Sequence, residues 1–193
     1  MPFDAASARS VGDAPRFRMI AHNVDVSGVV AELQAQPELW NENRYRTHNP
    51  TSPHHGIDDI WVRWRGEDDP GSPNEPHFAA DLAPWHALPS LHPIVRGLSH
   101  MVDARFRGGI LITQTPPGGE VKTHVDRGWH AGFYTTKLYL TLWSNPQCVI
   151  HCDGQEQSFR AGEVWSYPNN VPHGVRNAGV TPHANVIICF RSE

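Results

Sequence analysis

The chain has 193 residues and a formal net charge of −4, so it is long enough for one domain with a substantial apolar core, and it lacks the basic excess that nucleic-acid binding requires. Three Cys without a C-x-x-C pair support neither a disulfide framework nor a zinc ribbon. The chain shows no apolar run of signal-peptide length and no segment of the ~20 apolar residues that a membrane span needs, so we expect a soluble, cytoplasmic protein without membrane or nucleic-acid partners.

Residues 1 to about 15 are small and polar, and we expect a flexible tail followed by a single domain over residues 16–193. A short strand is predicted near residues 17–20. Ser27 is placed to cap a helix whose apolar side chains face inward. A second helix is predicted over residues 93–102, with one apolar stripe that covers a face of the sheet. The inward residues are, for the first segment, Val29, Val30, Leu33, Leu39 and Trp40, and for the second, Ile94, Leu98, Met101 and Val102.

Residues 41–66 combine a polar, Pro-containing loop with a short strand, I60-WVRW. The irregular spacing of His48, His54 and His55 favours a solvated loop over a metal site. Arg63 lies among aromatic residues of the strand, where it either faces solvent or binds a carboxylate of a substrate or cosubstrate. The acidic, Gly- and Pro-containing residues 67–76 are predicted to form a surface loop that is long enough to act as a lid.

The pattern changes at Gly109, after which about eight short β-branched or aromatic runs follow one another without helices between them. Such runs, separated by Gly, Pro, Asn or Asp, predict a mostly β fold: an antiparallel double-sheet jelly roll over about residues 109–191, with flanking N-terminal helices. Alternation in the run that starts at Lys137 places Tyr139 and Thr141 on the same face as Lys137, and three leucines on the other face. The inward faces of such a fold can hold a small ligand.

Two predicted turns precede the side chains that could bind a metal ion. Residues 116–119, P-P-G-G, precede His124 and Asp126, which share a face if the segment is extended. Residues 169–172, N-N-V-P, precede His173. Two imidazoles and one carboxylate are the ligand set that holds Fe(II) and leaves coordination positions open for a cosubstrate and oxygen. We therefore predict a non-haem iron site formed by His124, Asp126 and His173.

These motifs resemble the aspartyl/asparaginyl β-hydroxylase-like branch of the Fe(II)/2-oxoglutarate dioxygenases. The resemblance covers roughly residues 110–190 and rests on two runs, T-P-P-G-G-E-V-K-T-H and G162-EVWSYPNNVPHGVRNAG, with a weaker likeness in I60-WVRW. It implies a double-stranded β-helix, or cupin-like jelly roll, that uses Fe(II), 2-oxoglutarate and molecular oxygen. The implied reaction decarboxylates 2-oxoglutarate to succinate and hydroxylates a C–H bond of an amino acid, a peptide side chain or a related small molecule.

The resemblance also implies roles for individual residues. Thr113, Lys137 and Tyr139 stand where the family contacts 2-oxoglutarate. His183 stands where the family has an Arg that grips a carboxylate of the cosubstrate, and His is a shorter, partly protonated donor. Three alternatives follow. His183 together with Thr113 binds this carboxylate, or Lys137 or Arg176 forms the salt bridge in place of the family's Arg, or the cosubstrate is not 2-oxoglutarate. Strand alternation relative to an inward His173 points Arg176 outward.

The segment after Asp126 is expected at the mouth of the site. Two roles are possible for Arg127, Trp129 and His130. They bind a carboxylate or planar group of the substrate, or they form a loop whose Trp packs on the rim. Two other classes of function share the same ligands. A cupin-like binding or sensor module would bind ligands without turnover, and a Zn- or Mn-dependent isomerase or hydrolase would act without oxygen.

Overall fold

The structure is a computed structural model that describes residues 15–66, 69 and 75–192. Its strands form two sheets with antiparallel pairing throughout the described registers. The larger sheet has the order β1-β9-β6-β11-β4-β2-β3, with bounds β1 Arg18–Ala21, β2 Asp58–Arg65, β3 Ala79–Asp81, β4 Phe106–Thr115, β6 Thr136–Trp143, β9 Val164–Ser166 and β11 His183–Arg191. The smaller sheet has the order β5-β10-β7-β8, with bounds β5 Glu120–His124, β7 Cys148–Cys152, β8 Gln155–Gln157 and β10 His173–Asn177.

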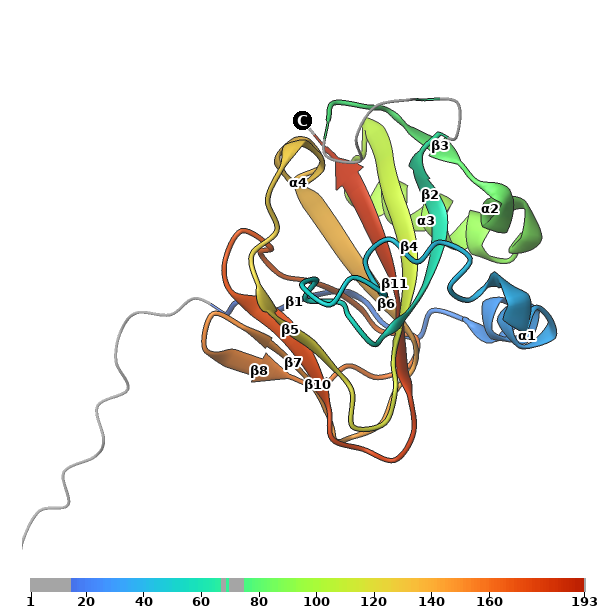
Figure 1. The fold of residues 1–193 in the computed structure, drawn as a ribbon. Helices are drawn as coiled ribbons and strands as arrows, with labels where there is room; N and C mark the ends of the chain where they lie inside the picture. The colour runs from blue at the N-terminus through green and yellow to red at the C-terminus, as the bar shows by residue number, and fades with distance from the viewer. Residues whose placement is uncertain (1–14, 67–68, 70–74, 193) are drawn as a thin grey trace, which may run out of the picture.

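Helices cover the side of the larger sheet that faces away from the smaller one (Figure 1). They are α1 Ser27–Ala35, the 3-10 turn η1 Pro37–Leu39, α2 Ala83–Ala87 and α3 Leu91–Met101, while α4 Trp129–Phe133 lies on the other side, between β5 and β6. None of the helices in the described ranges combines the length and the apolar character needed to cross a membrane.

Alternation along β6 divides the interior into an apolar core and a polar cavity. Leu138, Leu140 and Leu142 are buried with the apolar faces of α1 and α3. Lys137 and Tyr139 point the opposite way, into the space between the sheets. A β-strand presents alternate side chains to opposite faces, so one apolar row builds the core and the polar row is available for a site. The predicted division of this strand is confirmed.

The predicted jelly roll is confirmed. Six of the eight predicted runs after Gly109 match β4, β6, β7, β9, β10 and β11, whereas the runs predicted to begin at His124 and Gln157 overlap β5 and β8 by one residue each. Three features were not predicted, namely β3, α2 and α4. The predicted cap was wrong: Val26 is the N-cap residue of α1, and Ser27 instead donates hydrogen bonds to the carboxylate of Asp25. The tail and most of the proposed lid loop lie outside the described residues.

The second predicted helix begins two residues earlier than expected, at Leu91, and its buried stripe differs. Leu91, Val95 and Leu98 are buried, and the predicted Ile94 and Val102 are partly buried against the same core, whereas Met101 is 63% exposed. The earlier start adds Leu91 to the apolar face, one turn before Ile94 and Val95.

Candidate metal centre

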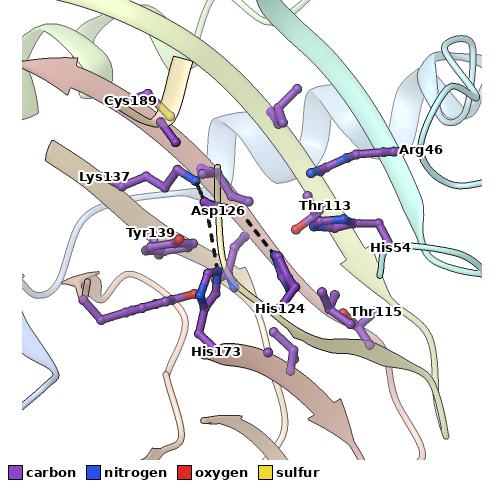
Figure 2. A pocket seen from close by; sticks show the side chains of 18 of the residues that line it. Arg46, His54, Thr113, Thr115, His124, Asp126, Lys137, Tyr139, His173 and Cys189 are labelled. Carbon is purple, nitrogen blue, oxygen red and sulfur yellow. Dashed lines mark hydrogen bonds and ion pairs between the residues drawn. The ribbon is translucent and has the colours of Figure 1, made fainter. Parts of the chain in front are cut away.

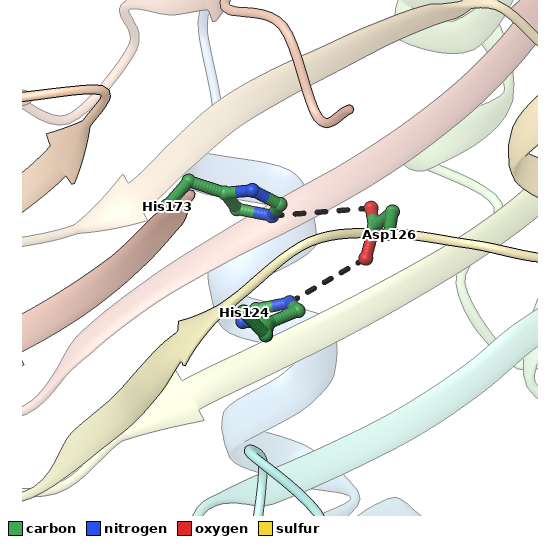
Figure 3. Close-up of side chains that lie close together, drawn as sticks. All are labelled: His124, Asp126 and His173. Atoms are coloured by element: carbon green, nitrogen blue, oxygen red, sulfur yellow. Dashed lines mark ion pairs between the residues drawn. The ribbon is translucent and has the colours of Figure 1, made fainter. Parts of the chain in front are cut away.

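Neighbouring strands of the smaller sheet bring the predicted triad together. His124 ends β5 and is the cross-strand partner of His173, which begins β10. Asp126 follows β5, and its backbone N–H donates to the Asn169 carbonyl at 2.9 Å, which ties it to the turn before His173. Asp126 Oδ1 lies 3.4 Å from His124 Nε2, and Oδ2 lies 3.9 Å from His173 Nε2 (Figure 3). One nitrogen or oxygen from each residue lies within 4.8 Å of the others.

Hydrogen bonds on the far side of each imidazole prepare the rings for a metal. His124 Nδ1 lies 2.8 Å from the Lys122 carbonyl, and His173 Nδ1 lies 2.9 Å from the Val171 carbonyl. A carbonyl only accepts, so each Nδ1 carries the proton and each Nε2 presents a lone pair toward Asp126. Two such nitrogens and a carboxylate oxygen repel one another unless a cation lies among them. The donor set therefore fits a divalent metal ion.

Burial and the local charges keep Asp126 ionised and His173 neutral. Burial by itself raises the pKa of Asp126, but contact with His124 and the positive charge of Lys137 outweigh it, and the pKa of the carboxyl lies well below its usual range. Burial also lowers the pKa of His173. At neutral pH the site thus offers one carboxylate and a neutral His173 imidazole.

The triad opens into a cavity of about 210 Å³ between the two sheets. This volume is below the ~300–1,000 Å³ of typical drug-sized pockets, so it suits a small ligand. Trp64 and His130 stack at 4.1 Å on one wall, and His130 Nε2 accepts a hydrogen bond from the Gly109 N–H at 3.1 Å. Burial lowers the pKa of His130 to about 3, which keeps it neutral.

All four residues expected to contact the cosubstrate line this cavity: Thr113, Lys137, Tyr139 and His183. The Lys137 ammonium binds the Asp126 carboxylate (Figure 2). Tyr139 stacks on Tyr167 at 4.2 Å, and its hydroxyl accepts a hydrogen bond from Asn169.

His183 is poorly suited to grip a carboxylate. It is 2% exposed, and burial lowers its pKa to about 4, so it is neutral at physiological pH. Its Nε2 accepts from the Asn185 amide at 2.7 Å, and its Nδ1 lies 2.8 Å from the Ser144 hydroxyl. Arg176 is exposed on β10, as strand alternation predicts.

The three residues expected to bind substrate lie in different places. Arg127 lines the cavity and is exposed at its rim. Trp129 stacks on Phe133 at 4.8 Å and is not among the lining residues. Arg63 also lies outside the cavity lining, because its guanidinium binds Asp81 and the Ala79 carbonyl. We therefore leave Arg63 and Trp129 out of the proposed site.

Two lining residues come from the loop that the sequence predicts to be solvated. Arg46 and the partly buried His54 both face the cavity, and the ring of His54 lies 4.9 Å from that of His124. Backbone hydrogen bonds hold the loop in place, from Asn41 to Asp59 at one end and from Lys122 to Pro53 at the other. These contacts join residues that are far apart in the sequence, so the local sequence pattern does not predict them.

Solved structures with the same fold include iron oxygenases. A prolyl-4-hydroxylase from Pseudomonas putida has a TM-score of 0.54 and 19% identity, over 92% of this chain and 93% of that one. A 2OG-Fe(II) oxygenase family oxidoreductase from Burkholderia pseudomallei has a TM-score of 0.52 and 14% identity, over 71% of this chain and 67% of that one. No curated protein sequence matches the chain.

The sequence itself is similar to one described family. The profile of the family described as Aspartyl/Asparaginyl beta-hydroxylase matches residues 83–191, which is more than half of the chain and includes all three residues of the triad. With this match and the oxygenase fold, the chain belongs to the aspartyl/asparaginyl β-hydroxylase family and is an Fe(II)- and 2-oxoglutarate-dependent dioxygenase.

Proposed function

We propose that this enzyme hydroxylates a C–H bond of an amino acid, a peptide side chain or a related small molecule, with His124, Asp126 and His173 holding the iron. The observation that carries the proposal is the convergence of two imidazole Nε2 atoms and one carboxylate, with both Nδ1 atoms tied to backbone carbonyls. Iron, when bound, supplies the redox chemistry that couples decarboxylation of 2-oxoglutarate with hydroxylation. One oxygen atom of O₂ enters succinate, the other enters the new hydroxyl group, and carbon dioxide leaves.

The residues around the triad position the reactants and exclude water. Lys137 orients Asp126 through its ion pair. Thr113 and Tyr139 offer hydroxyl groups to the cosubstrate from the floor of the cavity. The aromatic wall of Trp64 and His130 excludes water from one side. The cavity is small, so we propose that only the reacting side chain of the substrate enters it, while Arg127 contacts the remainder at the rim.

Succinate formation tests the proposal. Purified protein with Fe(II), 2-oxoglutarate and O₂ should release succinate, and the rate should rise when a correct amino acid or peptide is added. The product should then gain one oxygen atom by mass spectrometry. Binding of 2-oxoglutarate without any succinate would favour a non-catalytic binding module, and product formation without O₂ would favour an isomerase or hydrolase.

A further inference from the structure

A second fixed cation, the guanidinium of Arg46, enters the pocket from the side opposite Lys137 (Figure 2). Its Nε and Nη2 donate to the carboxylate of Asp59, with Nη2 to Oδ1 at 2.9 Å. Asp59 is fully buried, so this ion pair holds the planar guanidinium in one orientation. The Nη1 group donates to no residue in the described part of the chain, so part of the donor fork is available to a ligand.

The register of the larger sheet places this cation beside Thr113. Asp59 on β2 is the cross-strand partner of Thr113 on β4, and Thr113 in turn pairs with Asn185 on β11. Directly opposed residues of antiparallel strands project from the same face with their Cβ atoms ~5 Å apart. Thr141 on β6 continues the row, because its hydroxyl donates to Asn185 at 2.8 Å. A polar row thus crosses four strands on the cavity side, and Arg46 lies at its β2 end.

Two residues that the family resemblance puts forward for the far carboxylate of 2-oxoglutarate, His183 and Lys137, fit it less well. His183 is neutral, and both of its ring nitrogens are engaged. Lys137 binds Asp126, and a second carboxylate at that ammonium would lie against a metal ligand of the same charge. A cosubstrate that binds the metal through its keto acid carries its other carboxylate at the opposite end of its carbon chain. That group therefore needs a cation away from the triad.

Arg46 and the triad line the same cavity. The loop that supplies Arg46 also supplies His54, whose ring lies 4.9 Å from that of His124. A dicarboxylate bound at the triad therefore extends within the cavity that Arg46 lines.

We propose that Arg46, held by Asp59 beside Thr113, binds the carboxylate of 2-oxoglutarate that lies farthest from the metal. This inference rests on the proposed function, because it takes 2-oxoglutarate to be bound at the triad. It makes Arg46, supplied by a loop before the jelly-roll core, the residue that selects a dicarboxylic over a monocarboxylic keto acid.

The experiment compares the binding of two keto acids that differ only in the far carboxylate. Protein loaded with Mn(II) is titrated by calorimetry with 2-oxoglutarate and with 2-oxopentanoate. The wild type should bind 2-oxoglutarate at least about 30-fold more tightly, since losing one partner of a buried, hydrogen-bonded charge pair costs ~2 kcal/mol or more. The double variant Arg46→Gln/Asp59→Asn, which leaves no buried unpaired charge, should bind both keto acids with similar Kd.

Three further variants complete the comparison. Arg46→Lys keeps the positive charge but loses the planar set of guanidinium N–H donors. It should retain only part of the preference for 2-oxoglutarate over 2-oxopentanoate. Arg44→Gln, an exposed arginine of the same loop, and Lys137→Met should both keep the preference. An unchanged preference in the Arg46→Gln/Asp59→Asn variant, or its loss in Lys137→Met alone, overturns the inference. Equal wild-type binding of the two keto acids also overturns it, whereas wild-type binding of neither contradicts the proposed function as well.

Discussion

Asp126 supplies the carboxylate of the triad, and its charge is its main contribution to metal binding. Asp126→Asn preserves the size of the side chain but removes that charge, so the affinity for Mn(II) should fall by at least about 100-fold. Titration followed by electron paramagnetic resonance measures this loss. Asp153→Asn is a matched control, because Asp153 pairs with Arg16 away from the cavity and should bind Mn(II) as the wild type does.

A metal affinity in Asp126→Asn equal to that of the wild type would remove Asp126 from the site. Circular dichroism should show the same secondary structure for both aspartate variants, because Asp126 lies after β5 and not within the apolar core. Loss of the folded signal in Asp126→Asn would instead assign the carboxylate a structural role.

At the residue scale, the sequence predicts those site residues whose positions follow from short spacings along the chain. His124 and Asp126 are two residues apart after a P-P-G-G turn, and their convergence with His173 follows from one strand pair. The sequence around Arg46 does not predict that it lines the cavity, because only contacts of its loop with β2 and β5, which are distant in the sequence, bring it there. The neutral state of His183 also depends on burial, which spacing alone does not reveal.

At the element scale, the start of β4 supports the aromatic wall of the site. A Cβ at Gly109 would collide with the Trp64 ring and lie 3.0 Å from His130 Nε2. Gly109→Ala should therefore displace this wall and lower the free energy of unfolding by ~1–3 kcal/mol, as overpacking does. Urea denaturation measures the change. Gly132→Ala is the control, because nothing lies within 4 Å of its Cβ position.

A Gly109→Ala variant as stable as the wild type would show that Trp64 and His130 can move without cost. In that case their stacking would be a weak feature of the cavity wall, and its role in excluding water would have to be assigned to other residues.

The elements that the sequence predicts best are those with a strong two-residue alternation. The leucines of β6 and the apolar run of β11 are buried as their patterns indicate. The five-residue helices α2 and α4 are too short for a helical period to appear, and tertiary packing determines them. In α3 the predicted Ile94, Leu98 and Val102 pack on the core, but the exposure of Met101 in the last turn was not predicted from the helical period.

At the scale of the whole molecule, two buried histidines make stability depend on pH. Burial lowers the pKa of His183 to about 4 and that of His130 to about 3, from an ordinary value of 6.5. Below pH 6.5 the unfolded chain takes up protons that the folded protein does not. The free energy of unfolding should therefore fall as the pH drops, by up to about 1.4 kcal/mol per pH unit for each histidine, and the contribution of His183 should level off near pH 4.

Urea denaturation at pH 7 and pH 5 checks this dependence. His183→Gln cannot titrate, so its stability should differ less between the two pH values than that of the wild type. An identical difference in both proteins would mean that His183 is not the source of the acid sensitivity.

The central claim is that one metal ion binds where the two sheets face each other, at side chains from β5, β10 and the segment after β5. Crystals grown without oxygen in the presence of Fe(II) and 2-oxoglutarate, with diffraction measured at the iron absorption edge, test it most directly. We predict a single anomalous peak within ~2.0–2.2 Å of His124 Nε2, His173 Nε2 and an Asp126 oxygen. A peak at other side chains, or no peak at these three in iron-saturated crystals, would contradict the account.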